Sequence, residues 1–114
     1  MGVVAPWTDT WSAERTTWRE RAAWIGGDEV FAVDYQVCPR CRLGWVEQPW
    51  THEEHRRSGL AAAGLSALRN ENPGFAWHTL GGHMPESRGF WAAVGDGVIG
   101  AYARRSICSH RSAG

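Results

Sequence analysis

Residues 56–59, Arg-Arg-Ser-Gly, combine residue types that can bind an anion. They follow a predicted strand over residues 44–50, in which Pro49 lies near the end, where a missing backbone donor is tolerated. They also open a predicted helix over residues 58–70, which is rich in alanine and leucine. The start of a helix leaves several backbone N–H groups unpaired and carries a partial positive charge. Since Gly59 has no side chain to block close approach and the arginines add fixed cations, the segment is suited to a phosphate or pyrophosphate.

The same segment resembles a known motif. The pattern Arg56-x-x-Gly59-x-Ala61 is similar to the Arg/Gln-x-x-Gly-x-Gly/Ala pyrophosphate loop of the GNAT superfamily, the acyl-CoA-dependent N-acyltransferases. Further along, the stretch SRGFWAAVG at residues 87–95 resembles the family's small-x-x-Phe-Tyr-x-x-x-Gly-Phe signature. The resemblance covers residues 44–97, about half of the chain. The alternative is that the arginines are solvated residues at an ordinary helix start.

The resemblance implies that the chain binds acyl-CoA and transfers an acetyl group from acetyl-CoA to an amine of unknown class. In the family, two central parallel strands splay apart and the pantetheine arm lies between them. Here those strands would be residues 44–51 and 74–80, and the pyrophosphate would meet the backbone of residues 57–61. The implied cofactor-binding residues are Gln48, Trp50, Arg56, Arg57, Ser58, Gly59, Leu60, Ala61, Phe90 and Trp91.

Amine acylation needs a base for the amine and a proton for the departing thiolate. The resemblance places Glu47 best for the base, although a strand glutamate can equally face solvent or pair with an arginine. His78 on the neighbouring strand is the second candidate, because imidazoles titrate near neutral pH, but a partly buried structural histidine is the alternative.

Trp91 stands where the family usually has the tyrosine that protonates the thiolate. An indole N–H cannot act as an acid near neutral pH. Either Tyr102 or His83 replaces it, or the proton returns through water. The remaining possibility is a non-catalytic GNAT-like module that binds CoA or a protein partner and is stabilised by zinc.

The cysteines form a second pattern. Cys38-x-x-Cys41 lies in a predicted hairpin turn with a proline after the first cysteine, and Cys108-x-His110 lies in the C-terminal tail, so the four could make a tetrahedral Cys₃His zinc site. The topology predicts that this site closes only if the last strand runs antiparallel to its neighbours. The alternatives are ordinary reduced cysteines or a redox Cys-x-x-Cys.

Length and composition limit the class of protein. With 114 residues the chain is predicted to form one domain, residues 1–114. The formal net charge is zero and no apolar run is long enough to cross a bilayer, so we expect no nucleic-acid or membrane partner and a cytoplasmic location. All twelve basic residues are arginine, which excludes lysine Schiff-base chemistry. The eight tryptophans are expected mainly in the core.

The remaining elements follow from periodicity. An amphipathic helix is predicted from Thr8 or Thr10 to Ile25, and its tryptophans could support a homodimer. Strands are predicted over residues 29–37, 75–80 and 98–104, and a helix begins at Pro85. The fold class is α/β (α+β): a small GNAT-like mixed sheet with a central parallel strand pair and helices on both faces. It is abbreviated at the N-terminal side, without the extra strands that usually precede the hairpin.

Overall fold

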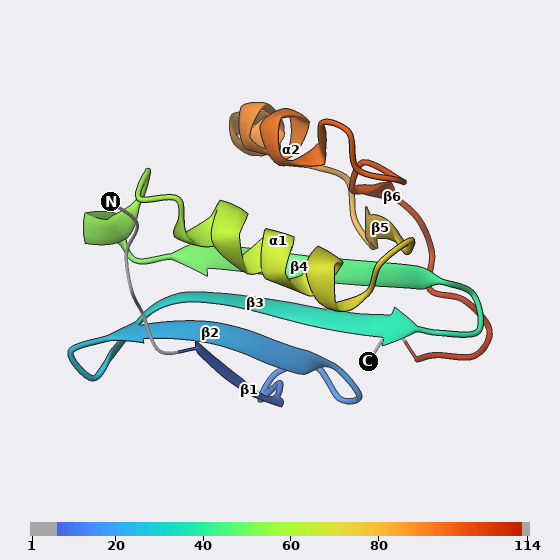
Figure 1. Cartoon of the computed structure of the whole chain (residues 1–114), viewed down its shortest axis with the longest axis horizontal. Coiled ribbons are helices and arrows are strands. Elements are labelled where there is room, and N and C mark those ends of the chain that lie inside the picture. Colours follow the sequence, from blue (N-terminus) through green and yellow to red (C-terminus); the bar gives the residue numbers. More distant parts are fainter. Residues whose placement is uncertain (1–6, 113–114) are drawn as a thin grey trace.

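Six strands form one mixed sheet in the computed structural model, which describes residues 7–112 (Figure 1). Their spatial order is the order of the chain, and their bounds are β1 Trp7–Trp11, β2 Arg19–Ile25, β3 Asp28–Cys38, β4 Leu43–Thr51, β5 Ala76–Thr79 and β6 Ala103–Arg104. The first four strands are antiparallel, whereas β4, β5 and β6 run parallel. The predicted central parallel pair is therefore confirmed as β4 and β5.

Two α-helices connect the parallel strands. Helix α1, Leu60–Glu71, joins β4 to β5, and helix α2, Arg88–Gly95, joins β5 to β6 after a short 3₁₀ turn at Pro85–Ser87. Together with the mixed sheet they give the predicted α/β class. No helix within residues 7–112 is both long enough and apolar enough to cross a membrane.

The predicted strand over residues 29–37 is confirmed as β3, and its alternation explains the main core. Phe31 and Val33 are fully buried on one face of the sheet, where Leu65 and Leu68 of α1 pack against them. On the neighbouring strand Val46 joins the same cluster. Burial of these aliphatic and aromatic side chains holds α1 against the sheet.

The predicted N-terminal helix is wrong, because this segment forms the antiparallel hairpin of β1 and β2. Trp11 is 68% exposed whereas Trp18 is fully buried, so these two residues do not share a helical face. Thr17 adopts a left-handed conformation in the turn between the strands, which ends any helix there. The chain thus contains two strands before the β3–β4 hairpin, where the sequence predicted none. The helical surface proposed for a homodimer does not exist.

The expected helices on both faces are also corrected. Both helices lie on one face, with Tyr102 between them: its hydroxyl accepts a hydrogen bond from Arg69 of α1, and its ring packs on Trp91 of α2. The connections from β4 to β5 and from β5 to β6 each move to the next strand in the same direction across the sheet. Because such parallel connections are right-handed, both helices lie on the same face. The second face is covered by Trp18 and by residues 105–112, around Trp45.

The predicted last strand over residues 98–104 is reduced to two residues. Ala101 and Tyr102 both have positive φ angles, of 48° and 57°, so the backbone turns where the strand was expected to run. Only Ala103 and Arg104 then pair with β5, and they do so in parallel.

Gly44 marks the closest packing between β4 and β5, and its replacement by alanine should destabilise the fold. A Cβ at this position would lie 2.6 Å from the ring of Trp77, which is itself buried. We expect Gly44→Ala to lower the free energy of unfolding by about 1–3 kcal/mol, as overpacking in a core does. Denaturant unfolding measures this. Gly89→Ala, an open position in α2, is the control and should be neutral or slightly stabilising.

Asp9 makes the stability of the sheet edge depend on pH. Burial opposes its ionisation, but hydrogen bonds from Tyr35, Arg19 and Arg21 together outweigh burial and hold the pKa of Asp9 below its ordinary value of 3.8. A lowered folded-state pKa gives stability that is fully present above the ordinary value and is lost as the pH falls through the folded value. The acid limb of wild-type unfolding should therefore be steeper than that of Asp9→Asn. The exposed Asp96→Asn, which removes the same charge away from this cluster, is the matched control.

Candidate functional site

Strands β4 and β5 pair over only three residues and then separate. Leu43, Gly44 and Trp45 lie opposite Ala76, Trp77 and His78, but β4 continues to Thr51 without a partner on that side. Gln48 has a positive φ of 50°, and β4 has one residue more than β3 between their paired positions there, which is a β-bulge. The bulge turns the end of β4 away from β5. A wedge between two parallel strands results, as the resemblance implied.

A cleft of about 980 Å³ occupies this wedge. Its walls are the end of β4, the start of α1, the loop after β5 and one side of α2. Nine of the ten predicted cofactor-binding residues line it: Gln48, Trp50, Arg56, Arg57, Gly59, Leu60, Ala61, Phe90 and Trp91. Ser58 is the exception, and its hydroxyl donates to the carbonyl of His55. The structure therefore brings together residues from four separate segments of the chain.

The N-terminus of α1 opens into the cleft. Gly59 is its N-cap residue with φ of 85°, and no side chain among the described residues caps this end. The first intrahelical bond is donated by Ala63 to the carbonyl of Gly59, so the amides of residues 60–62 have no helical partner. A Cβ at Gly59 would have no atom within 4 Å. The helix start is thus an open, positively polarised site with Arg56 and Arg57 beside it.

Glu47 lies where the two strands part. Its Oε2 accepts a hydrogen bond of 2.9 Å from the backbone N–H of Leu80, and its Oε1 is 3.7 Å from Arg15. The carboxylate thus bridges β4 and the loop after β5 at the floor of the cleft. Asp34, its neighbour on β3, lies 3.6 Å from the same arginine, and burial raises the pKa of Asp34 above its ordinary value, with Ser12 and Arg15 acting against it.

The other two predicted catalytic residues do not line the cleft. His78 is buried, and its Nδ1 donates to the carbonyl of Ala103. Tyr102 is fully buried with its hydroxyl on Arg69, and burial raises the pKa of that hydroxyl above 10.0 while Arg69 opposes the shift. Both side chains are held inside the protein by contacts that do not face the cleft.

Trp91 and His83 form a stacked pair at the cleft wall. Their ring centroids are 4.8 Å apart with an angle of 17° between the planes. His83 Nε2 donates to the carbonyl of Tyr102 at 2.8 Å, which leaves Nδ1 as the second ring nitrogen. Among the two replacements predicted for the missing tyrosine, only His83 lines the cleft.

Several lining residues were missed by the sequence analysis as part of the site. They lie at the third position of α1, at the end of β5 and in the loop after β5, and they are Ala62, Thr79, Gly81, Gly82 and Met84. Arg15, which faces Glu47, was assigned to a helix that does not exist. The Gly81-Gly82 pair directly after a strand could have indicated a loop at the carboxyl edge of the parallel pair, where ligands of α/β sheets bind.

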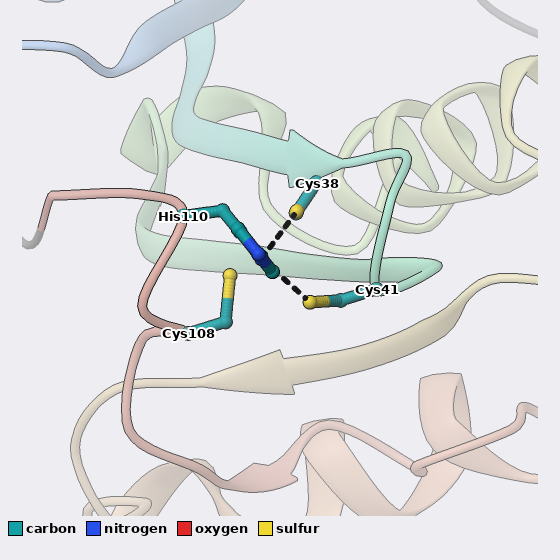
Figure 2. Close-up of side chains that lie close together, drawn as sticks. All are labelled: Cys38, Cys41, Cys108 and His110. Atoms are coloured by element: carbon teal, nitrogen blue, oxygen red, sulfur yellow. Dashed lines mark hydrogen bonds between the residues drawn. The ribbon is translucent and has the colours of Figure 1, made fainter.

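The second cluster lies at the opposite end of β4. Figure 2 shows Cys38 at the end of β3, Cys41 in the turn, and Cys108 and His110 in the C-terminal segment, with their side chains directed toward one another. The four ligand atoms all lie within 4.8 Å of one another. His110 Nδ1 is 3.2 Å from the sulfur of Cys41 and 4.0 Å from that of Cys38. The structure therefore brings together the four residues that the sequence predicted.

The topological condition for this cluster was wrong. The last strand is parallel to β5, yet the tail reaches the hairpin. Because β6 ends at Arg104, residues 105–110 turn back across the second face of the sheet, and the carbonyl of Arg105 accepts a hydrogen bond from the Trp45 indole. The direction of a two-residue strand does not determine where the following chain goes.

No model of a known protein family matches the chain, and no curated protein matches it. Similar solved structures include the diaminobutyrate acetyltransferase EctA from Paenibacillus lautus, in complex with L-2,4-diaminobutyric acid and coenzyme A. That match has a TM-score of 0.41 and 33% identity, over 45% of this chain and 31% of the other. A ribosomal-protein-alanine N-acetyltransferase from Brucella melitensis biovar Abortus 2308 matches with a TM-score of 0.45 and 23% identity, over 54% of this chain and 46% of the other. The chain thus spans less than half the length of either structure.

Proposed function

We propose that this protein is an acyl-CoA-dependent N-acyltransferase that moves an acetyl group from acetyl-CoA to an amine. One observation carries the proposal: the wedge between β4 and β5 leads directly to the uncapped N-terminus of α1. A ligand that fits both parts is extended and carries a diphosphate at a fixed distance from its reactive end. Acyl-CoA has this form.

The binding mode follows from the free backbone groups. The diphosphate accepts hydrogen bonds from the amides of residues 60–62, and Arg56 and Arg57 supply positive charge. The pantetheine arm, which has two amides, lies along residues 48–51 in the place that a strand would take. Trp50, which is 44% exposed, supplies an apolar surface beside it.

The reaction is the attack of a neutral amine on the thioester carbonyl. A C–N bond forms, the C–S bond breaks, and one proton passes from nitrogen to the CoA sulfur. We propose that Glu47 accepts the amine proton through a water molecule, since it lines the floor of the cleft. His83, in its imidazolium form, returns a proton to the thiolate from Nδ1, the nitrogen not used by the Tyr102 carbonyl.

A non-catalytic CoA-binding or protein-interaction module is the second candidate. It is favoured by Trp91, which stands at the usual position of the proton donor, and by Tyr102, whose hydroxyl is bound to Arg69. In this case acyl-CoA binds in the same cleft but no acetyl transfer follows.

Calorimetry and product analysis separate these candidates. Acetyl-CoA should bind the wild-type protein, and an enzyme should release CoA with a panel of amines. Release should be followed by mass spectrometry, because the three cysteines of the chain would react with thiol reagents. Absence of binding at millimolar acetyl-CoA contradicts the acyltransferase and the CoA-binding module, whereas binding without turnover supports the CoA-binding module.

A further inference from the structure

We propose that Cys38, Cys41, Cys108 and His110 bind one structural zinc ion, which fastens the C-terminal segment across the second face of the sheet. This goes beyond the proposed function, because the cluster and the cleft lie at opposite ends of β4. Cys41 precedes the start of β4 at Leu43, whereas the cleft is lined by the other end of that strand. The metal is therefore assigned to the fold and takes no part in acyl transfer.

The geometry of the cluster fits a tetrahedral ion. Zinc binds sulfur at about 2.3 Å and imidazole nitrogen at about 2.0–2.1 Å, so the ligand atoms of a tetrahedral Cys₃His site lie about 3.5–3.8 Å from one another. The two distances from His110 Nδ1, 3.2 Å and 4.0 Å, bracket this range, and no pair of ligand atoms exceeds 4.8 Å. Small side-chain rotations suffice to bring all four atoms to one metal.

The chemistry of the donors selects the kind of metal. Three thiolates and an imidazole are soft and borderline ligands, which favour zinc over calcium or magnesium. All four tetrahedral positions are filled by the protein, and this is the property of a structural site, since a catalytic site leaves one position open. Each of the four residues offers one ligand atom, and the three cysteines are free thiols rather than disulfides.

The C-terminal segment gives an independent reason for a metal. Residues 105–112 contain no helix or strand, and most of their side chains are exposed. Ile107 and Cys108 nevertheless pack against the buried cluster around Trp18 and Trp45, and the carbonyl of Ser112 accepts from Gln36 at 2.7 Å. The segment is also held by hydrogen bonds of Arg105 to Thr79 and Trp45. With most of its side chains exposed, however, burial offsets little of the entropy of ordering these eight residues. A metal bound jointly by this segment and the β3–β4 turn would provide the missing constraint.

Metal analysis of the purified 114-residue chain tests the proposal. We expect about one zinc per chain. After chelation, titration with cobalt chloride should give the absorption of tetrahedral cobalt together with a thiolate charge-transfer band. Cys108→Ser and His110→Ala should lose stoichiometric zinc, and the matched control Ser109→Ala, between the two ligands, should keep it. Circular dichroism reports whether each variant is folded.

Limited proteolysis provides a readout that does not require variants. Chelation should accelerate tryptic cleavage after Arg104 and Arg105, whereas cleavage after Arg56 and Arg57, in the exposed segment before α1, should not change. The proposal is overturned if wild-type protein supplied with zinc chloride and desalted carries no zinc, or if cobalt gives an octahedral spectrum. It is also overturned if the two ligand variants retain zinc as well as Ser109→Ala does, or if chelation leaves the cleavage rates unchanged.

Discussion

Replacing Gly59 by aspartate is expected to weaken CoA binding by about 100-fold or more, which corresponds to about 3 kcal/mol. The carboxylate would lie at the open end of α1, where the amides of residues 60–62 have no acceptor within the helix. It would compete for those amides and repel the diphosphate. Calorimetry with CoA measures the change.

Two variants separate charge from backbone strain in this experiment. Gly59→Asn has nearly the same shape without the charge, and asparagine tolerates the left-handed conformation that φ of 85° requires. It should weaken binding far less than the aspartate does. Gly97→Asp places the same residue at another open glycine of positive φ, at the turn after α2, and should bind CoA normally. Equal affinities for Gly59→Asp and wild type would show that this helix end does not hold the diphosphate.

Replacing Glu47 by glutamine is expected to lower kcat by about 10²–10⁴-fold, the usual range for loss of a general base. Glutamine can still accept the hydrogen bond from the Leu80 N–H, so the hydrogen bond that connects β4 to the loop after β5 should be kept. CoA affinity should therefore stay close to wild type. The rate loss should appear in kcat.

Glu86→Gln is the matched control for this variant. Glu86 is an exposed carboxylate that also lines the cleft, at the start of the 3₁₀ turn before α2. Its loss changes the net charge by the same amount without removing the proposed base. A Glu47→Gln enzyme with normal kcat would show that the amine loses its proton elsewhere.

The part of the cleft that β4 and the start of α1 form could be predicted from the sequence because it is local. A strand, a glycine turn with two arginines and a helix start are contiguous in residues 44–71, and their chemistry depends on backbone groups that neighbours in sequence create. Strand β3 could be predicted equally well, because apolar residues alternate along one of its faces. In both cases the local pattern and the final packing agree.

The N-terminal third could not be predicted in the same way. Trp11, Trp18 and Ala22 have helical spacing, but the tertiary structure buries Trp18 on the second face and exposes Trp11 at the sheet edge. Alanine-rich β2 has little strand propensity of its own, and it becomes a strand because β1 and β3 pair on either side. The return of the tail to the hairpin likewise depends on packing around Trp45, which no local pattern encodes.

An amide NMR titration with CoA tests the central claim most directly. If the helix start and the wedge bind acyl-CoA, saturable shift changes should concentrate at the amides of residues 59–62 and at those of Gln48, Trp50 and Thr51, with little change around Cys38 and Cys41. Unchanged amides at residues 59–62 in millimolar CoA, or changes confined to the hairpin end of the sheet, would contradict the claim.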